Sequence, residues 1–383
     1  MRILTSIFNT IFIAIFVILM SAGLLGQAQN VNVSVGVLGL FHPLHFVVTP
    51  VAGSALVVHV GADALVLETS SGVSSAKIRL HGENEVVDIG GRILRGSTVT
   101  VTGRDGGPVE FNLAVPGRIT RRYQGVLELK PQSGALIAIV TMDLETAVAS
   151  VVAAEGAADT PAEALKALAV AARSYFMANK GRHRDYDFCD TTHCQFLRTP
   201  PSSASPAAQA ASSTRGLVIV YQSQTVGAMY TRSCSGHTHT PAELGLPSSA
   251  YPYYAVECRY CRQHPSRWQS RISAEDAASL RSSNEPSRLQ VGRHLGWSVV
   301  PSNDFVVRKE GDHILLRGIG QGHGIGLCQA GATAMAEDGS DFRKILSYYY
   351  PNTVVTALAA SSSARNSIPA ASFLWGLRHF PDN

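Results

Sequence analysis

Charge is sparse in this 383-residue sequence, and it is only weakly biased in sign. Charged residues make up 16% of the chain, and the formal net charge is +4. That surplus is too small to indicate nucleic-acid binding, although it would not oppose an anionic polymer. The sequence also contains no basic run and no RNA-binding motif. We therefore predict no nucleic-acid partner.

Several enzyme signatures are missing as well. No G-x-S-x-G stretch is present, which argues against a serine hydrolase of that type. A glycine-rich block near the C-terminus contains neither G-x-G-x-x-G nor GK[ST], so it gives no support for phosphate binding. Most of the six cysteines lie near histidines, a pattern more typical of metal sites than of a cysteine protease.

The N-terminal segment, residues 1–30, reads as a targeting signal. Arg2 is followed by a mostly apolar run from Ile7 to Leu25, and Gly26-Gln27-Ala28 places small residues where a signal peptidase cuts. No cysteine follows that could carry a lipid. We predict a signal peptide over residues 1–28, with an uncleaved membrane anchor as the alternative. Either reading predicts an exported protein of the periplasm or cell envelope.

The rest of the chain predicts an α+β fold. Residues 29–140 consist of short alternating apolar runs separated by turn residues, which indicates a β-rich subdomain. Residues 141–358 mix helical and strand-like patterns and form the predicted core. The Ser/Ala-rich residues 359–383 are predicted to be a disordered tail.

Two predicted helices meet at Glu155. The first begins near Asp143, and the second runs from Pro161 to Lys180 after a capping-box pattern at Thr160–Glu163. Glu155 would lie at the C-terminal end of the first helix, before Gly156. The negative end of a helix dipole and apolar neighbours both raise the pKa of a carboxyl group. Glu155 is therefore a candidate general acid, although a solvated helix-end glutamate is the simpler alternative.

Two cysteine clusters could bind metal. His183, Cys189, His193 and Cys194 form the usual ligand complement of a structural zinc ion, with a Cys189–Cys194 disulfide as the alternative. In the second cluster, Cys234, Cys258 and Cys261 would need His237 or His239 to complete a zinc site. A disulfide from Cys234 to one of the other two is equally compatible with this sequence.

Further polar residues are candidates for substrate binding. The glycines between Gly318 and Gly331 suggest backbone held close to a ligand or to the core helix. His323 and Gln329 are the polar groups that this block offers. Arg173, on the helix after Glu155, could anchor an acidic or acetamido group. Packing or solvation alone would also account for each of these residues.

Two stretches of this sequence resemble motifs of the stage II sporulation protein D (SpoIID) family. They are EALKALAVAARSY, which follows Glu155, and GHGIGLCQAGA at residues 322–332. The resemblance extends over roughly residues 32–356. Cys328 departs from it, since relatives often carry serine there. The resemblance implies a lytic transglycosylase that cleaves peptidoglycan between N-acetylmuramic acid and N-acetylglucosamine and leaves 1,6-anhydro ends. A single glutamate, matched here by Glu155, would act as both acid and base.

The resemblance also implies a structural zinc ion, because relatives hold zinc with a His/Cys cluster just after the core helix. Peptidoglycan glycan strands are the expected partner, and a cell-wall amidase is a second one. The alternative function is a non-catalytic wall-binding or amidase-enhancing protein with the same fold. The residues expected to act are Glu155 in catalysis, Arg173, His323 and Gln329 in substrate binding, and His183, Cys189, His193 and Cys194 in zinc binding.

Overall fold

The computed structural model describes residues 31–358, apart from 69, 71, 83, 247–248, 274, 277–290 and 293–294. The predicted signal peptide (1–28) and tail (359–383) lie outside the described residues. Residues Asn32–Ala357 form one compact unit. Among the described helices, none has the length and apolar character needed to cross a bilayer.

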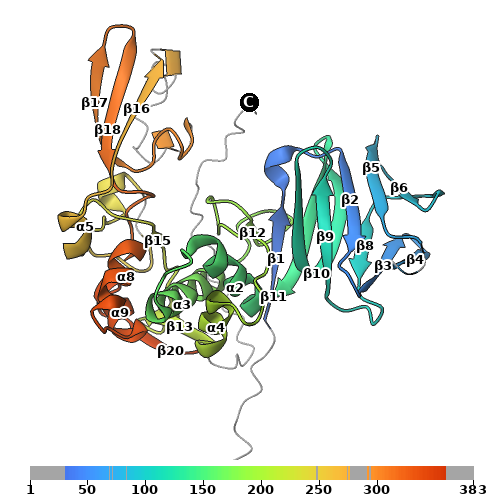
Figure 1. Ribbon diagram of the computed structural model, residues 1–383, viewed down its shortest axis with the longest axis horizontal. Coiled ribbons are helices and arrows are strands. Elements are labelled where there is room, and N and C mark those ends of the chain that lie inside the picture. Colours follow the sequence, from blue (N-terminus) through green and yellow to red (C-terminus); the bar gives the residue numbers. More distant parts are fainter. Residues whose placement is uncertain are drawn as a thin grey trace, which may run out of the picture. The chain divides into compact units, whose positions relative to one another are not determined.

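The first part of this unit is built from strands of one large sheet (Figure 1). Alternate residues along these strands are buried, as expected for strands with one face against a core. The strands are β1 Asn32–Val37, β2 His45–Pro50, β3 Ala55–Val60, β4 Asp63–Glu68, β5 Ala76–His81, β6 Asn84–Ile89, β7 Arg92–Gly96, β8 Val99–Thr102, β9 Val109–Val115, β10 Ile119–Gln132 and β11 Ala135–Asp143.

The long strand β10 connects two halves of this sheet. Its first half pairs with β9, and its second half pairs with β8 on one side and β11 on the other. Gly125 lies where the pairing changes. A Cβ atom there would lie 2.5 Å from the carbonyl oxygen of Thr141, so only glycine lets the strands approach this closely.

Glu85 on β6 is an exception to the apolar interior of this region. It shares the inward-facing side of the strand with Val87 and Ile89, and 0% of its surface is exposed. Burial, and then the nearby charge of Glu128, raises the pKa of Glu85 from 4.5 to about 8. The folded protein therefore keeps this carboxyl group protonated at neutral pH, which lowers stability relative to a neutral side chain.

We expect Glu85→Gln to stabilise the protein at neutral and alkaline pH. Between pH 4.5 and about 8, Glu85 is protonated when folded and ionised when unfolded. The wild-type free energy of unfolding therefore falls by about 1.4 kcal/mol per pH unit in this window. The advantage of Glu85→Gln should grow across the window and vanish below it.

Denaturant unfolding at several pH values measures this effect. Glu110→Gln is the control, because the Glu110 side chain is 41% exposed. Parallel pH dependences for wild type and Glu85→Gln would contradict the assignment.

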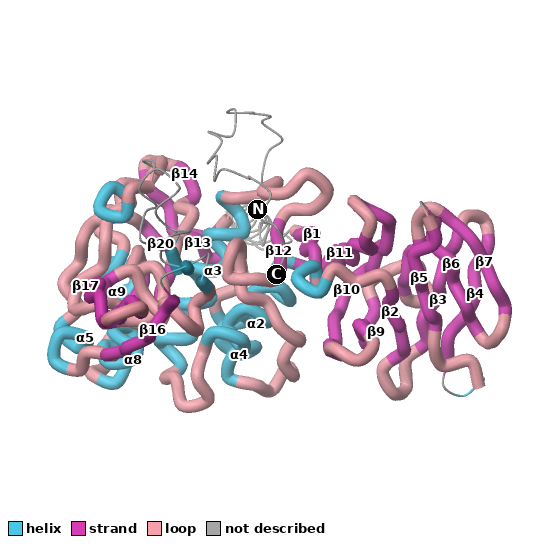
Figure 2. Tube along the Cα trace, turned by 90° about the horizontal axis from the view of Figure 1, so that it is seen from above, coloured by secondary structure: helices cyan, strands magenta, loops and turns pink. Residues whose placement is uncertain are grey.

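Strand β11 leads directly into the helical core. Asp143 caps α2 (Leu144–Glu155) through a 2.9 Å hydrogen bond from the Glu145 amide to its side chain. The helix α3 (Ala162–Ala178) follows. It is contacted by α2, α4 (Pro206–Ser213), α8 (Gln329–Glu337) and α9 (Phe342–Tyr349). Its alanines are buried around most of the helix, and these small side chains let several elements approach it closely. Figure 2 shows these helices grouped together, with the strands β2 to β10 in a separate region.

The remaining elements complete the core and add a small three-stranded sheet. In the latter, β16 and β17 both pair with β18, over a core of its own that includes Val300 and Leu316. The elements are η1 Gly39–Phe41, β12 Phe188–Cys189, β13 Leu217–Tyr221, β14 Gln224–Thr225, β15 Tyr230–Thr231, η3 Ala242–Leu244, α5 Arg259–Gln263, β16 Arg267–Ser273, β17 Asp304–Glu310, β18 His313–Ile319, β19 Leu327–Cys328, α8 Gln329–Glu337, α9 Phe342–Tyr349 and β20 Val354–Ala357.

The α+β class is confirmed, and so are the two helices around Glu155. The boundary predicted at residue 140 falls inside β11, within one compact unit, so it separates two regions of that unit. The capping box predicted at Thr160–Glu163 is wrong. Glu163 instead accepts hydrogen bonds from Lys166 and from the Phe342 amide, which ties α3 to α9.

Candidate active site

Glu155 is the last residue of α2, at the turn toward α3. Gly156 leaves the helix in an extended conformation, and its amide still bonds to the Val152 carbonyl at 2.8 Å. A Cβ atom on Gly156 would lie 2.7 Å from a methyl carbon of Leu165. Glycine therefore allows the end of α2 to pack directly on α3, and it fixes where Glu155 emerges.

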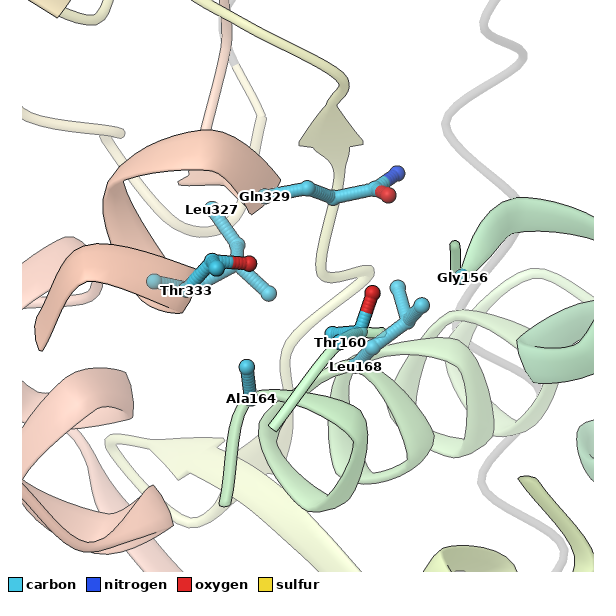
Figure 3. A pocket seen from close by; sticks show the side chains of 8 residues that line it. Gly156, Thr160, Ala164, Leu168, Leu327, Gln329 and Thr333 are labelled. Carbon is cyan, nitrogen blue, oxygen red and sulfur yellow. The ribbon is translucent and has the colours of Figure 1, made fainter. Parts of the chain in front are cut away.

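A small pocket adjoins this turn (Figure 3). Gln329 extends across it from the start of α8 toward Gly156. The amide Nε2 of Gln329 donates a 3.2 Å hydrogen bond to Oε2 of Glu155. The pocket is lined by Gly156, Thr160, Ala164, Leu168, Leu327, Gln329, Ala332 and Thr333.

The pairing of two short strands brings Gln329 to Glu155. β15 and β19 run parallel, with Tyr230 opposite Leu327 and Thr231 opposite Cys328. The residue after each strand then reaches the end of α2. Arg232 donates a 3.2 Å hydrogen bond to the backbone carbonyl of Glu155, one of the carbonyls that a helix leaves unsatisfied at its C-terminus.

The electrostatic setting of Glu155 favours its protonated form. Burial raises the pKa of Glu155 above its ordinary value. The hydrogen bond from Gln329 and the charges of Arg232 and Arg198 oppose this shift only in part. The raised pKa agrees with the sequence-based expectation, and a raised pKa is what a carboxyl group needs to act as a general acid.

The other carboxylates near Glu155 in the sequence are engaged elsewhere or exposed. Glu145 pairs with Arg173, and Glu163 pairs with Lys166. Asp187 accepts hydrogen bonds from the Ser34 amide and hydroxyl, and Asp159 is exposed at the surface. These contacts give no support to a two-carboxylate glycosidase that pairs Glu155 with one of these four.

Arg173 is not a substrate-binding residue, and that prediction is wrong. Its side chain is fully buried and makes two hydrogen bonds to Glu145, at 2.6 and 2.9 Å. It also donates to the backbone carbonyls of Leu217 and Ala211. Arg173 therefore joins α3 to α2, α4 and β13, and its burial leaves no surface for a ligand.

The glycine block lies beside the core helix α3, as predicted, and several of its glycines also approach β15 and the residues next to it. Ile325, Leu327 and Ala332 share one buried cluster with alanines of α3. A Cβ atom on Gly322 would lie 2.5 Å from the Thr231 hydroxyl, and one on Gly326 would lie 2.9 Å from the carbonyl carbon of Met229. His323 is half-buried, and its Nδ1 accepts a 3.0 Å hydrogen bond from the Ile325 amide. Its part in substrate binding stays a prediction.

The four predicted zinc ligands after α3 come together. The donor atoms of His183, Cys189, His193 and Cys194 all lie within 4.8 Å of one another, and both cysteines are free thiols. Cys194 Sγ lies 3.2 Å from a ring nitrogen of His183 and 3.4 Å from one of His193. Ligands around a tetrahedral zinc ion are separated by roughly 3.4–3.8 Å, so these side chains fit the ion.

The loop that carries this cluster is fixed to the large sheet. β12 pairs in parallel with β1, and Asp187 accepts hydrogen bonds from Ser34. The ring of Tyr186 stacks on His183 at 4.5 Å and fills the space over Gly36. Pairing with β1 and the packing of Tyr186 thus both hold the loop that carries the cluster.

Tyr230 and Gln195 are two candidate site residues that sequence reasoning missed. The Tyr230 hydroxyl donates a hydrogen bond to the side chain of Gln195, the residue after Cys194. Burial and then the charge of Glu155 raise the pKa of Tyr230 well above its ordinary value. This hydrogen bond links the loop of His183, Cys189, His193 and Cys194 to the surroundings of Glu155. No local pattern points to it, because it depends on where β15 lies.

The second cysteine cluster differs from the prediction in its fourth member. The Sγ atoms of Cys234, Cys258 and Cys261 are joined by that of Cys328, and not by a histidine. His239 instead forms a 2.8 Å contact with the carboxylate of Asp304. His237 packs edge-on against the His239 ring and is exposed.

The structure is thus that of an α+β protein in which burial raises the pKa of the carboxyl group of Glu155, at the turn between two helices. Comparison with known proteins gives the family. Residues 132–221, which include α2, α3 and Glu155, match the family model "SpoIID: Stage II sporulation protein". This segment belongs to the SpoIID family, as its motif predicted; the glycine block lies beyond the matched residues.

Two similar proteins match more of the chain than this segment, and a third matches a shorter part. An uncharacterised protein of Brachyspira hyodysenteriae is 28% identical over 262 residues, which is 60% of this chain and 70% of that protein. The stage II sporulation protein D of Bacillus subtilis is 26% identical over 265 residues, 57% of this chain and 76% of its own length. A protein named amidase enhancer, also from Bacillus subtilis, is 41% identical over 63 residues, which is 16% of this chain and 9% of that protein.

Proposed function

We propose that this protein is a cell-wall protein that cleaves peptidoglycan glycan strands as a lytic transglycosylase, with Glu155 as its general acid and base. The observation that carries the proposal is the half-buried carboxyl group of Glu155, which lies beside Gln329 and whose pKa is raised by burial. Membership of the SpoIID family and the named relatives support a role at the cell wall.

The proposed reaction needs only one carboxyl group. Protonated Glu155 donates its proton to the glycosidic oxygen as the bond from this oxygen to C1 of N-acetylmuramic acid breaks. The N-acetylglucosamine side leaves with a new hydroxyl group. The Glu155 carboxylate then takes the proton of the muramic C6 hydroxyl, whose oxygen bonds to C1 and closes the 1,6-anhydro ring. Glu155 is protonated again, and no water is consumed.

A digest of purified sacculi tests this proposal. We expect the protein to release soluble fragments whose muramic ends are lighter than hydrolysed ends by the mass of one water molecule. Mass spectrometry of the fragments, with sacculi carrying and lacking stem peptides, distinguishes the reaction from hydrolysis. Release of fragments with reducing ends only would contradict it.

Replacing Gln329 should move the pH dependence of this activity. The hydrogen bond from Gln329 lowers the pKa of Glu155, so Gln329→Leu should raise that pKa further. A general acid acts while protonated, so activity declines as pH rises through its pKa. The decline should therefore begin at a higher pH in Gln329→Leu than in the wild type.

The measurement is kcat/KM for glycan cleavage as a function of pH. Thr333→Val is a matched control, since Thr333 lines the same pocket from α8. Its pH profile should follow that of the wild type. If the alkaline decline of the Gln329→Leu profile is unchanged or moves to lower pH, the hydrogen bond from Gln329 does not set the pKa of Glu155.

We further propose that His183, Cys189, His193 and Cys194 bind one structural Zn²⁺ ion. With four protein ligands, such an ion has no position for a reacting water, so its contribution would be to hold the loop in place. The proposed substrate lies outside the cytoplasm. The function therefore requires export, which agrees with the targeting signal predicted at residues 1–28.

The second candidate function is a non-catalytic wall-binding protein that stimulates a cell-wall amidase. The 63-residue match to the protein named amidase enhancer favours it. Two assays separate the candidates. Under this second function, the protein alone would release no glycan fragments from sacculi, but it would increase the rate at which an added amidase removes stem peptides.

A further inference from the structure

A second sulfur cluster lies apart from the His183 cluster and has no part in the proposed reaction. Its members are Cys234, Cys258, Cys261 and Cys328, each no more than 2% exposed. They come from three separate places in the chain: the loop after β15, the start of α5, and the junction of β19 with α8. Their four Sγ atoms all lie within 4.8 Å of one another.

The separations fit one tetrahedral metal ion. The Sγ atoms of Cys261 and Cys328 are 3.5 Å apart. Sulfur ligands at about 2.3 Å from a tetrahedral zinc ion are separated by about 3.8 Å. A disulfide requires about 2.05 Å, and all six cysteines are free thiols. A polynuclear iron–sulfur cluster would hold its cysteine sulfurs farther apart than a single ion does.

The surroundings of Cys328 favour a metal-bound thiolate. Its Sγ caps the N-terminus of α8 and accepts hydrogen bonds from the amides of Gly331 and Cys234, at 3.5 and 3.4 Å. The positive end of a helix dipole and backbone amide donors both stabilise a negative sulfur. Such amide donors are the usual outer partners that orient a ligand to a metal.

The packing around the cluster leaves room for little else. A Cβ atom on Gly331 would lie 2.6 Å from Sγ of Cys258. The hydroxyl of Tyr349 lies 3.6 Å from the same sulfur. Only glycine at position 331 therefore lets α8 approach the four sulfur atoms. This packing explains why one residue of the C-terminal block is a glycine.

We propose that Cys234, Cys258, Cys261 and Cys328 bind one Zn²⁺ ion in a closed, purely structural Cys₄ site. The ion joins α5, the loop after β15 and the N-terminus of α8. Gln329 directly follows the ligand Cys328, so the same ion fixes the residue that donates to Glu155. Zinc also protects the four thiols from pairing as disulfides in an exported protein.

The wild-type protein, purified without chelators, provides the first test. We expect about two zinc ions per chain. X-ray absorption at the zinc edge should give an average of about three sulfur and one nitrogen ligands per ion, for one Cys₄ and one Cys₂His₂ site. One zinc with about four sulfur ligands would also support the Cys₄ site. One zinc with about two sulfur and two nitrogen ligands would overturn it, as would bound iron in place of zinc.

Variants assign the ions to their sites. Cys261→Ser should lose one equivalent and keep a zinc ion with two sulfur and two nitrogen ligands. Cys189→Ser is the reciprocal control, and it should keep an ion with four sulfur ligands. If Cys261→Ser does not fold, peptide mapping of the wild type still decides the question. A disulfide between any two of the four cysteines in the freshly purified protein would overturn the proposal.

Discussion

Replacing Glu155 with glutamine is expected to lower the release of anhydro-muropeptides by about 10²–10⁴-fold, the usual contribution of general acid–base catalysis. Glutamine keeps the size of the side chain and can still meet Gln329, but it can neither donate nor accept the catalytic proton. Folding and binding to sacculi should persist, because glutamine fits the half-buried space that Glu155 occupies.

Mass spectrometry of digested sacculi measures the release, and co-sedimentation with sacculi measures binding. Asp159→Asn is the matched control, because Asp159 is an exposed carboxylate in the same turn between α2 and α3. It should cleave at the wild-type rate. Near-wild-type cleavage by Glu155→Gln would mean that Glu155 is structural and that the proposed mechanism is wrong.

Cys189→Ser is expected to have the largest effect on stability. Structural zinc ions bind small domains with apparent free energies of about 10–16 kcal/mol near neutral pH, and much of this is folding energy. Loss of one ligand should therefore remove about one equivalent of zinc and lower the melting temperature substantially. Cleavage should fall too, because Gln195 in this loop holds Tyr230 beside Glu155.

Elemental analysis and thermal unfolding together measure the effect of Cys189→Ser. Thr191→Ala is the control, because its hydroxyl lies 3.2 Å from the sulfur of Cys189 but is not a ligand in the proposed set. It should retain the metal. A metal-free wild type in which Cys189 and Cys194 form a disulfide would contradict the zinc proposal.

The sequence predicts those parts of the site that depend on local patterns. Asp143 and Gly156 mark the ends of α2, so Glu155 could be placed at the helix terminus without knowing the fold. The His183 cluster lies within twelve consecutive residues, so its members could hardly be far apart. The direction of the pKa shift at Glu155 also follows from local composition, because burial among apolar residues is its main cause.

What the sequence does not predict depends on contacts between distant segments. The prediction that Arg173 binds substrate is wrong because the residue pattern of α3 does not show that this side chain faces Glu145 and α4. The sequence does not group Cys328 with the other cysteines, because only the parallel pairing of β15 with β19 brings it to them. His237 and His239 are closer to Cys234 in the sequence than Cys328 is, yet His239 contacts Asp304 and not the cysteine cluster.

The hydrogen bond between Glu155 and Gln329 joins residues 174 positions apart. Closing so long a loop carries a larger entropic cost than closing a local contact, and contacts of high sequence separation form late in folding. Helices α2 and α3 can form from neighbouring residues, but Glu155 acquires its partner only after β19 has paired with β15. A truncated chain that ends before residue 320 would retain Glu155 on its helix without Gln329, so the site is completed only when nearly the whole chain has folded.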